Sequence, residues 1–285
     1  MICEDLNNEN TVCHEGAVHI ISPHGAQRGS HYITVPGSDG DTLQSIAERA
    51  MVTVREIDAT IVSMDILGLS MNEGISFLEE ITGPITWPVT WIADDQVHTS
   101  GGIQIWAESD AQVTPIMLGQ YVAGALIETP DCTIARLGGL NGRIPTRTHV
   151  EQTNASLHQL LDALEAVDMD FSHVVRTWFY NCDIVSWYNE FNETRDDFFS
   201  THDLCEGLIP ASTGIGACNV SGSSLVTGLL AVHPKSDRVT MAEIPSPLQC
   251  PATDYGSSFS RAVEMDFPAY RELLISGTAS IEPEG

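Results

Sequence analysis

The chain has 285 residues, 42% hydrophobic and 18% charged, so it holds enough apolar material for the cores of two domains of ordinary size. Its 39 acidic residues outweigh 12 lysines and arginines and give a net charge of -27. Because phosphate binding needs clustered cations, this charge argues against nucleic acid or an anionic membrane as a partner, and no apolar run is long enough to cross a bilayer.

The first residues and the cysteines indicate a cytoplasmic protein. The stretch from Met1 to Asn8 has neither the basic segment nor the apolar core of a secretory signal peptide. The seven cysteines are odd in number and form no Cys-x-x-Cys pair, which favours reduced thiols over a disulfide framework or a structural zinc site. We therefore expect Cys182 and Cys218 to be small buried apolar residues.

The first third of the chain predicts a compact series of elements. An opening pair of strands is followed by a helix with one apolar face, which starts after a Ser-Asp-Gly-Asp turn that can cap it. A buried strand, a short helix and two further strands come next. In chain order the predicted elements are strands at 18–22 and 32–35, a helix at 41–57, a strand at 60–66, a helix at 72–81, and strands at 89–92 and 102–106.

The same series then recurs. An apolar stripe predicts a helix over 149–167, and a strand, a second helix and two strands follow it at 174–180, 184–199, 213–217 and 225–232. Pro88 and Pro210 stand at equivalent points before the last two strands. Two copies of a β-β-α-β-α-β-β order indicate an internal duplication, and the segregation of helices and strands is typical of α+β domains.

The end of the chain predicts the opening of a third copy. Residues 255–264 and 273–281 have the pattern of two strands joined by a turn, which is how each earlier copy begins. We therefore divide the chain into a first unit at 1–110, a second at 111–240, and a linker with the opening hairpin of a third unit at 241–285. The sequence is then expected to be a C-terminally truncated piece of a longer protein, or to be completed by a partner.

Several stretches resemble one known superfamily. The run HVEQTNASLHQLLDALEAVDMDFSHVVRTWFYNCDI is similar to the central helix and strand of RidA/YjgF proteins, formerly named endoribonuclease L-PSP, and FSRAV with LLISGTASIEPEG is similar to their opening hairpin. The stretches RTWFYNCDI and IPASTGIG look closest to the chorismatase branch. This resemblance implies chorismate-mutase-like α+β units in a pseudo-three-fold arrangement, reached as a homotrimer or within one chain, with ligand clefts between neighbouring units.

The chain departs from that family at positions that matter for chemistry. RidA imine deaminases share a Pro-Ala-Arg motif whose arginine holds the substrate carboxylate. Here the matching residues are Pro210-Ala211-Ser212 in the second unit and Pro88-Val89-Thr90 in the first. The family's acidic residue on the last strand falls near Thr227 and Ile105. Both units are therefore poor candidates for an ordinary imine or enamine deaminase.

Two arginines are candidates for binding a carboxylate. Arg195, in FNETRDDFF, matches a carboxylate-binding position of chorismatases by resemblance, and its planar guanidinium suits that contact. Its alternative role is an ion pair with Asp196 or Asp197 on the same helix. Arg261, in SSFSRAV, faces either a cleft between units or an ionic partner at a sheet edge.

Small residues and one tyrosine complete the candidate substrate-binding set. Ser212, Thr213, Gly214 and Gly216 lack bulky side chains, so their backbone N–H groups can approach a carboxylate or an oxyanion closely; the alternative is a plain strand after a proline turn. Strand alternation puts Arg176, Trp178 and Tyr180 on one face, where Tyr180 either donates to a ligand or packs across the strands.

The leading hypothesis is a RidA/chorismatase-like hydrolase or lyase that acts on a small carboxylated metabolite, an enol ether, an imine or an enamine. The ten histidines form no metal-binding spacing and no nucleotide-binding motif is present, so we expect neither a metal nor an organic cofactor. The resemblance places the catalytic acid beyond Gly285, which leaves the catalytic residues unknown. The alternative hypothesis is a non-enzymatic ligand-binding or regulatory scaffold, and ribonuclease activity is the weakest because no basic stripe exists.

Overall fold

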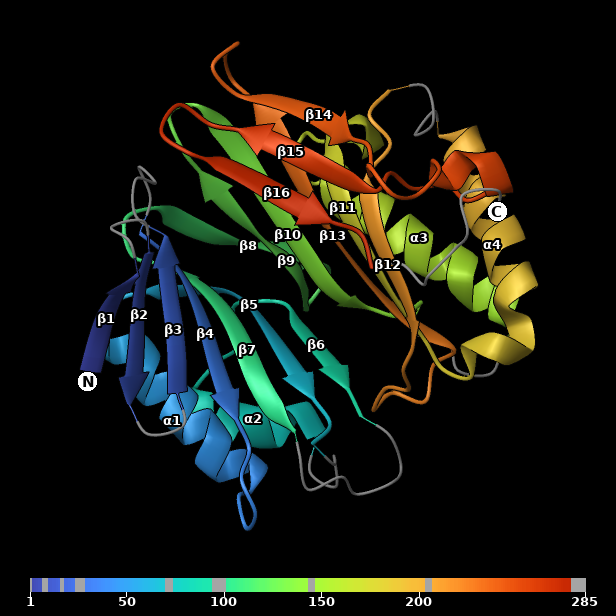
Figure 1. The fold of residues 1–285 in the computed structure, drawn as a ribbon. Coiled ribbons are helices and arrows are strands. Elements are labelled where there is room, and N and C mark those ends of the chain that lie inside the picture. The colour runs from blue at the N-terminus through green and yellow to red at the C-terminus, as the bar shows by residue number, and fades with distance from the viewer. Residues whose placement is uncertain are drawn as a thin grey trace.

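The computed structural model shows an α+β protein in which helices lie outside and β-sheets face inward (Figure 1). Within the part of the chain that it describes, the strands form three sheets of seven, six and three strands. The described residues are 2–6, 10–15, 18–23, 29–69, 74–93, 101–142, 147–202 and 207–277.

The first sheet has the strand order β1-β2-β3-β4-β7-β5-β6, and two helices cover one of its faces. Helix α1 starts at a capping box in which the side chains of Thr42 and Ser45 each accept a backbone N–H of the other residue. The elements are β1 (Ile2–Leu6), β2 (Asn10–Glu15), β3 (Val18–Pro23), β4 (Ser30–Pro36), α1 (Leu43–Glu56), β5 (Thr60–Leu67), α2 (Gly74–Thr82), β6 (Val89–Ile92) and β7 (Gly102–Glu108).

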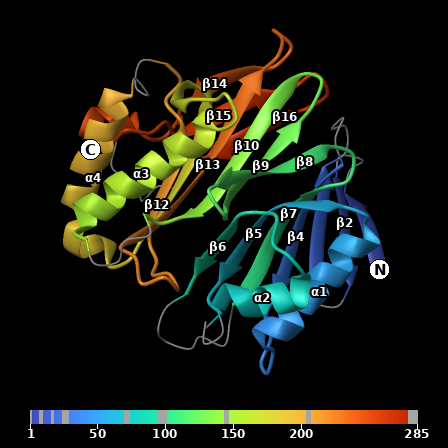
Figure 2. The ribbon, with the colours of Figure 1, turned by 180° about the vertical axis from the view of Figure 1, so that it is seen from behind.

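The second sheet has the order β12-β11-β13-β10-β9-β8, and α3 and α4 cover its outer face (Figure 2). A capping box of Thr148 and Glu151 starts α3. The elements are β8 (Gln112–Leu118), β9 (Tyr121–Glu128), β10 (Cys132–Leu140), α3 (His149–Glu165), the 3-10 turn η1 (Phe171–His173), β11 (Val174–Asn181), α4 (Ile184–Thr201), β12 (Ala211–Gly216) and β13 (Leu225–Pro234).

The tandem repeat is confirmed by the strand connections. Without β1, the first sheet has the order β2-β3-β4-β7-β5-β6. The second sheet, read from β8, has the order β8-β9-β10-β13-β11-β12. Strands that take the same place in the chain order of each copy thus take the same place in each sheet. In each copy the strand after the first helix pairs in parallel with the strand after the second helix, as β5 with β6 and β11 with β12. The predicted helices at 41–57 and 149–167 are α1 and α3 and occupy equivalent places.

The first sheet has two strands more than the predicted order, β1 and β2, and the second sheet has one more. In the second copy this strand is β8, which contains Pro115 and lies at the edge of its sheet, where a proline without an N–H is tolerated. The sequence pattern misses β8 because proline and polar residues interrupt its apolar alternation.

The third sheet repeats only the opening strands of a copy. Its elements are β14 (Thr240–Ile244), the 3-10 turn η2 (Ala252–Tyr255), β15 (Ala262–Asp266) and β16 (Arg271–Ile275), in the order β14-β15-β16. Residues 240–244, expected to begin a linker, form a strand that pairs with β15. The predicted strand at 273–281 overlaps β16, and its residues 278–281 lie outside the described residues.

Three apolar cores hold the molecule together. Two lie between a sheet and its helices, and they include Ile46 of α1 and Phe191 of α4. The third lies where the inner faces of the three sheets meet and includes Val62 of β5, Ile134 of β10 and Met265 of β15, each at most 4% exposed. The sheets therefore surround a common centre, as a pseudo-three-fold arrangement requires.

The expectation that all thiols are reduced is wrong for one pair of cysteines in the described part of the chain. Cys182 and Cys218 form a disulfide, although 36 residues separate them in sequence. The parallel pairing of β11 with β12 sets Asn181 opposite Gly216 and so brings together the chain segments that follow these strands. Spacing along the chain does not reveal this contact, because it depends on strand pairing.

No helix in the described part of the chain is both long and apolar enough to span a membrane.

Candidate functional site

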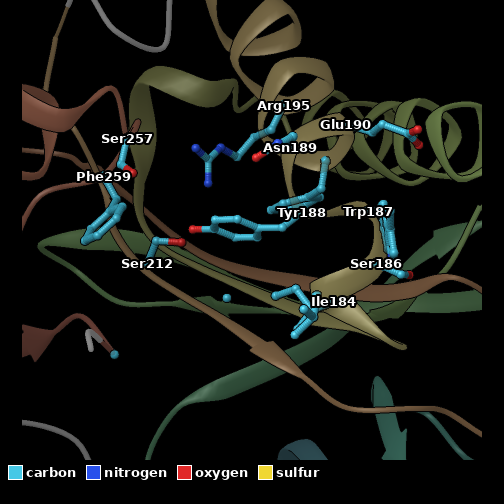
Figure 3. Close-up of a pocket in the computed structure, with 14 residues that line it drawn as sticks. Ile184, Ser186, Trp187, Tyr188, Asn189, Glu190, Arg195, Ser212, Ser257 and Phe259 are labelled. Atoms are coloured by element: carbon cyan, nitrogen blue, oxygen red, sulfur yellow. The ribbon is translucent and has the colours of Figure 1, made fainter. Parts of the chain in front are cut away.

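A cavity of about 670 Å³ lies between α4, β12 and the segments that flank β15 and β16. We call it the α4 cavity (Figure 3). Its wall combines the first two turns of α4 with small residues of β12 and of the third sheet's flanking segments. The lining residues are Ile184, Val185, Ser186, Trp187, Tyr188, Asn189, Glu190, Phe191, Arg195, Ser212, Gly214, Ser257, Phe259 and Gly277.

Short backbone contacts bring the third sheet against β12. Gly277 donates its N–H to the carbonyl of Ser212 at 3.1 Å, and the N–H of Ser212 donates to Ser276 Oγ at 2.8 Å. A Cβ added at Gly277 would lie only 3.0 Å from two side-chain atoms of Thr213, so any larger residue there would have to push Thr213 aside. The cavity is therefore a junction between the second unit and the third hairpin.

The start of α4 forms the opposite wall. Asp183 has the left-handed φ of 49°, and Trp187 leaves helical geometry at φ -142° and ψ 21°. The indole N–H of Trp187 donates to the carbonyl of Cys182 at 2.9 Å and anchors this kinked turn. In Figure 3 the ring of Tyr188 lies across the cavity with its hydroxyl directed toward Ser212.

Arg195 is the cation of this cavity and is 5% exposed. Its Nε and Nη2 donate to Asp196 Oδ1 at 3.1 and 2.9 Å, and Ser258 Oγ donates to the same oxygen at 2.7 Å. The Phe191 ring lies 5.5 Å from the guanidinium carbon. Figure 3 shows the guanidinium extending from α4 over the Tyr188 ring toward the segment of Ser257. The ion pair with Asp196 that the sequence offered is thus present, and Arg195 also lines the cavity; its contact with a carboxylate stays a prediction.

The charged and polar side chains that line the α4 cavity suit a ligand with a single anionic group. Among the described residues that line the cavity, Arg195 is the only arginine or lysine, and the carboxylate of Glu190 points away from the centre in Figure 3. Ser212 Oγ accepts a hydrogen bond from Thr177 Oγ1 at 2.8 Å, so its own O–H can donate to a ligand. The side chains of Trp187, Tyr188, Phe191 and Phe259 supply aromatic surface.

The other predicted glycine and threonine positions lie around this cavity with different roles. Gly214 lines it, and no atom lies within 4 Å of a Cβ built there. Gly216 instead lines a neighbouring cavity of about 490 Å³, where Ile184 lies 3.0 Å from such a Cβ. Thr213 Oγ1 accepts from Arg176 Nη2, on the inner face of β12, away from α4.

Arg261 lies outside the α4 cavity. Its Nε and Nη2 donate to the carbonyl of Cys250 at 2.9 and 2.8 Å, and the side chain lines a separate cavity of about 230 Å³ with Glu243. Its guanidinium carbon lies 5.7 Å from the centre of the Phe259 ring, and Phe259 does line the α4 cavity. Arg261 therefore packs against Phe259, a residue of the cavity wall, without lining the α4 cavity itself.

Tyr180 belongs to a buried network on the inner side of the second sheet. Burial raises the pKa of Tyr180 to about 12, and the charge of Asp65 acts in the same direction. Two guanidinium groups lie over the Trp178 ring, with the carbon of Arg136 at 4.3 Å and that of Arg176 at 5.2 Å from the ring centre. Arg176 Nη1 also donates to the carbonyl of Ile275 at 2.8 Å, which ties this network to the third sheet.

Sequence reasoning misses several residues of the cavity wall, chiefly Tyr188, Ser257, Phe259 and Gly277. Along the chain they stand out only as parts of a helix and of a hairpin. The signal that could have singled out the last three is their position in the stretches SSFSRA and LLISGTASI, which resemble a family whose clefts lie between units. In the described ranges, no group of three or more His, Cys, Asp or Glu side chains is arranged to hold a metal ion.

Comparison with known proteins finds likeness at the level of the fold. No protein-family model and no curated protein matches the chain. Among solved structures, a chorismatase is 21% identical over 88% of this chain and 70% of that chain, with a TM-score of 0.47. Two smaller E. coli proteins are similar as well. TdcF with bound serine is 16% identical over 42% of this chain and 92% of its own, with a TM-score of 0.34, and the YjgF gene product is 20% identical over 41% and 91%, with a TM-score of 0.33. The similar structures thus include a chorismatase and a YjgF protein.

Proposed function

We propose that the α4 cavity binds a small carboxylated metabolite and that the protein is a cofactor-independent hydrolase of the RidA/chorismatase type. The observation that carries the proposal is the guanidinium of Arg195. It is 5% exposed, is fastened along one edge by Asp196, and extends over the cavity. An arginine held in this way keeps its remaining N–H groups in a fixed plane, which favours a bidentate contact with a carboxylate.

The rest of the lining supports a ligand with a flat apolar part. Aromatic rings contribute large contact areas with little conformational freedom to lose, and the cavity has four such side chains: Trp187, Tyr188, Phe191 and Phe259. Ser212 and Ser257 add hydroxyl groups near the guanidinium. These features suit a cyclic or conjugated carboxylate better than a sugar or a phosphate.

Hydrolysis of an enol ether or an imine additionally requires a proton donor beside the substrate. Tyr188 is the candidate for this role, since its phenolic O–H points into the cavity toward Ser212 in Figure 3. The simplest step that these groups support starts with proton donation from Tyr188 to the vinyl carbon of an enol ether or to the nitrogen of an imine. Water then attacks the resulting cationic carbon and returns a proton to the phenolate, and the hemiketal or carbinolamine collapses to a ketone and an alcohol or ammonia.

The second candidate function is a binding or regulatory scaffold without catalysis. Two observations favour it: Ser212 replaces the arginine of the Pro-Ala-Arg motif, and Glu190, the carboxylate among the lining residues, points away from the cavity. Turnover separates the two candidates, because a scaffold binds the carboxylate but releases neither pyruvate from an enolpyruvyl ether nor ammonia from an imine.

The proposal is tested with Arg195→Gln and with Arg238→Gln as the matched control. Arg238 is a surface arginine whose side chain is 62% exposed and pairs with Asp131. We expect Arg195→Gln to weaken calorimetric binding of benzoate or chorismate at least about tenfold, since a charge-assisted bidentate contact is lost. The control should bind like the unmodified protein. Equal affinity of both variants would assign Arg195 to a purely structural ion pair.

A further inference from the structure

We propose that the α4 cavity is redox-regulated: the disulfide Cys182–Cys218 holds its α4 wall in place, and reduction loosens that wall and weakens ligand binding. The part concerning the ligand rests on the proposed function. The part concerning the wall stands on geometry alone. It is argued from the two places where the disulfide is attached and from the small number of other contacts that fix the first turns of α4.

The disulfide joins the start of α4 to a segment that is anchored on the first unit. Cys182 directly precedes the helix, and Cys218 follows β12. The carbonyl of Cys218 accepts from the N–H of Ala93 at 3.1 Å, and the next residue, Asn219, forms an isolated bridge with Ile92 of β6. The covalent bond thus connects the cavity wall to the contact between units.

The wall itself has few other attachments. From Asp183 to Glu190 the only buried residue is Trp187, whereas Val185 is 90% and Tyr188 46% exposed. No side chain caps the N-terminus of α4, and the kink at Trp187 removes regular helical geometry from the first turn. An uncapped, solvent-exposed turn of this kind has low local stability.

The single buried anchor also depends on the disulfide-bonded residue. The indole of Trp187 donates to the carbonyl of Cys182, so the position of Cys182 determines where the aromatic anchor of the wall lies. By contrast, the sheet next to it keeps its own bonds. Cys182 N donates to Ser224 O at 2.8 Å, and Ala217 N donates to Asn181 O at 2.9 Å. Reduction should therefore affect residues 183–190 and leave β11 and β12 paired.

Both cysteines are half-buried, so a thiol reagent has access to the bond. A thiolate of a small dithiol or of a thioredoxin-like protein attacks one sulfur and forms a mixed disulfide, and its second thiolate then displaces the other protein sulfur. In this two-electron exchange the S–S bond of the protein breaks, Cys182 and Cys218 become thiols, and the dithiol becomes a disulfide. Reoxidation by a disulfide of higher potential reverses the step.

The test uses the full chain in oxidised form and after treatment with dithiothreitol, with thiol counting to verify each state. Hydrogen exchange of residues 183–190 should quicken on reduction, and benzoate binding should weaken about tenfold, because a loosened wall must be ordered again on binding. The double variant Cys182→Ser, Cys218→Ser should behave like the reduced protein under both conditions. Cys250→Ser, which removes a half-buried free thiol, should keep the response.

Two results would overturn the inference. Unchanged exchange at 183–190 after verified reduction would show that the disulfide does not hold the wall, whatever the ligand. Faster exchange with unchanged benzoate affinity would show that the wall does not govern binding. If no carboxylate binds in either state, the proposed function fails, and the exchange experiment still decides whether the disulfide holds the wall.

Discussion

At the scale of single residues, the site depends on how one buried cation is held. Arg195 shares Asp196 Oδ1 with Ser258, so a single carboxylate oxygen joins α4 to the segment before β15. Asp196 therefore has two opposite effects on a bound anion. It orients the guanidinium, and its negative charge repels the ligand, although its side chain is 35% exposed and that charge is partly screened by water.

Two substitutions at Asp196 separate these effects. Asp196→Asn keeps an acceptor oxygen and removes the charge, so carboxylate binding should stay within about threefold of the unmodified protein or become tighter, because exposed charges are screened. Asp196→Ala removes the acceptor as well and should weaken binding about tenfold through loss of orientation. Calorimetry with benzoate measures both. If Asp196→Ala binds as tightly as Asp196→Asn, the acceptor oxygen does not position Arg195 for the ligand.

At the scale of elements, the cavity exists because a strand edge and a hairpin approach each other without side chains between them. Gly277 contacts Thr213 and the carbonyl of Ser212, while Gly214, two residues further along β12, faces open space. The two glycines thus do different things: one permits the junction of the second and third sheets, and the other leaves room for a ligand.

Alanine at each glycine should give different results. Gly277→Ala places a Cβ 3.0 Å from Thr213 and should lower the free energy of unfolding by about 1–3 kcal/mol, as overpacking does. Gly214→Ala meets no atom within 4 Å, so stability should hold while binding of a carboxylate weakens because the cavity shrinks. Urea unfolding and calorimetry on both variants test this. Equal stability of the two proteins would mean that the junction adjusts without cost.

At the scale of the whole molecule, the third sheet differs from the other two. Helices cover the outer faces of the first and second sheets, but on the third sheet Leu273 is 48% and Ile275 66% exposed. Both residues lie on β16, which ends the order β14-β15-β16 in the described part of the chain. An apolar strand at a sheet edge is prone to pair with another chain.

We therefore expect a second copy of the chain to associate through β16 at high concentration. The double variant Leu273→Lys, Ile275→Lys should shift the protein toward monomer in light scattering, because charged lysines on an edge strand oppose its pairing with another chain. Val185→Lys is the matched control, since Val185 is 90% exposed but lies on α4. A monomeric unmodified protein at millimolar concentration would contradict the expectation.

The repeat and most of its elements follow from local signals in the sequence. The capping boxes at Thr42 and Thr148 and the apolar stripes behind them specify where α1 and α3 begin, and these signals act over a few residues. The strands that follow the helices of each copy are placed within a few residues, whereas β8, β9 and β10 at the start of the second copy have no predicted range. These interactions join residues that are close together in the sequence, so the α+β class and the duplication can be predicted without a structure.

The tertiary structure alone decides which distant residues meet. The disulfide of Cys182 with Cys218 and the approach of Gly277 to Ser212 both depend on strand pairing across 36 or more residues. The same pairing puts Arg195 at the α4 cavity and Arg261 behind its wall, although both look alike as rare cations in an acidic chain. Spacing along a chain cannot distinguish them, because the distance between two side chains is set by the sheets that carry them.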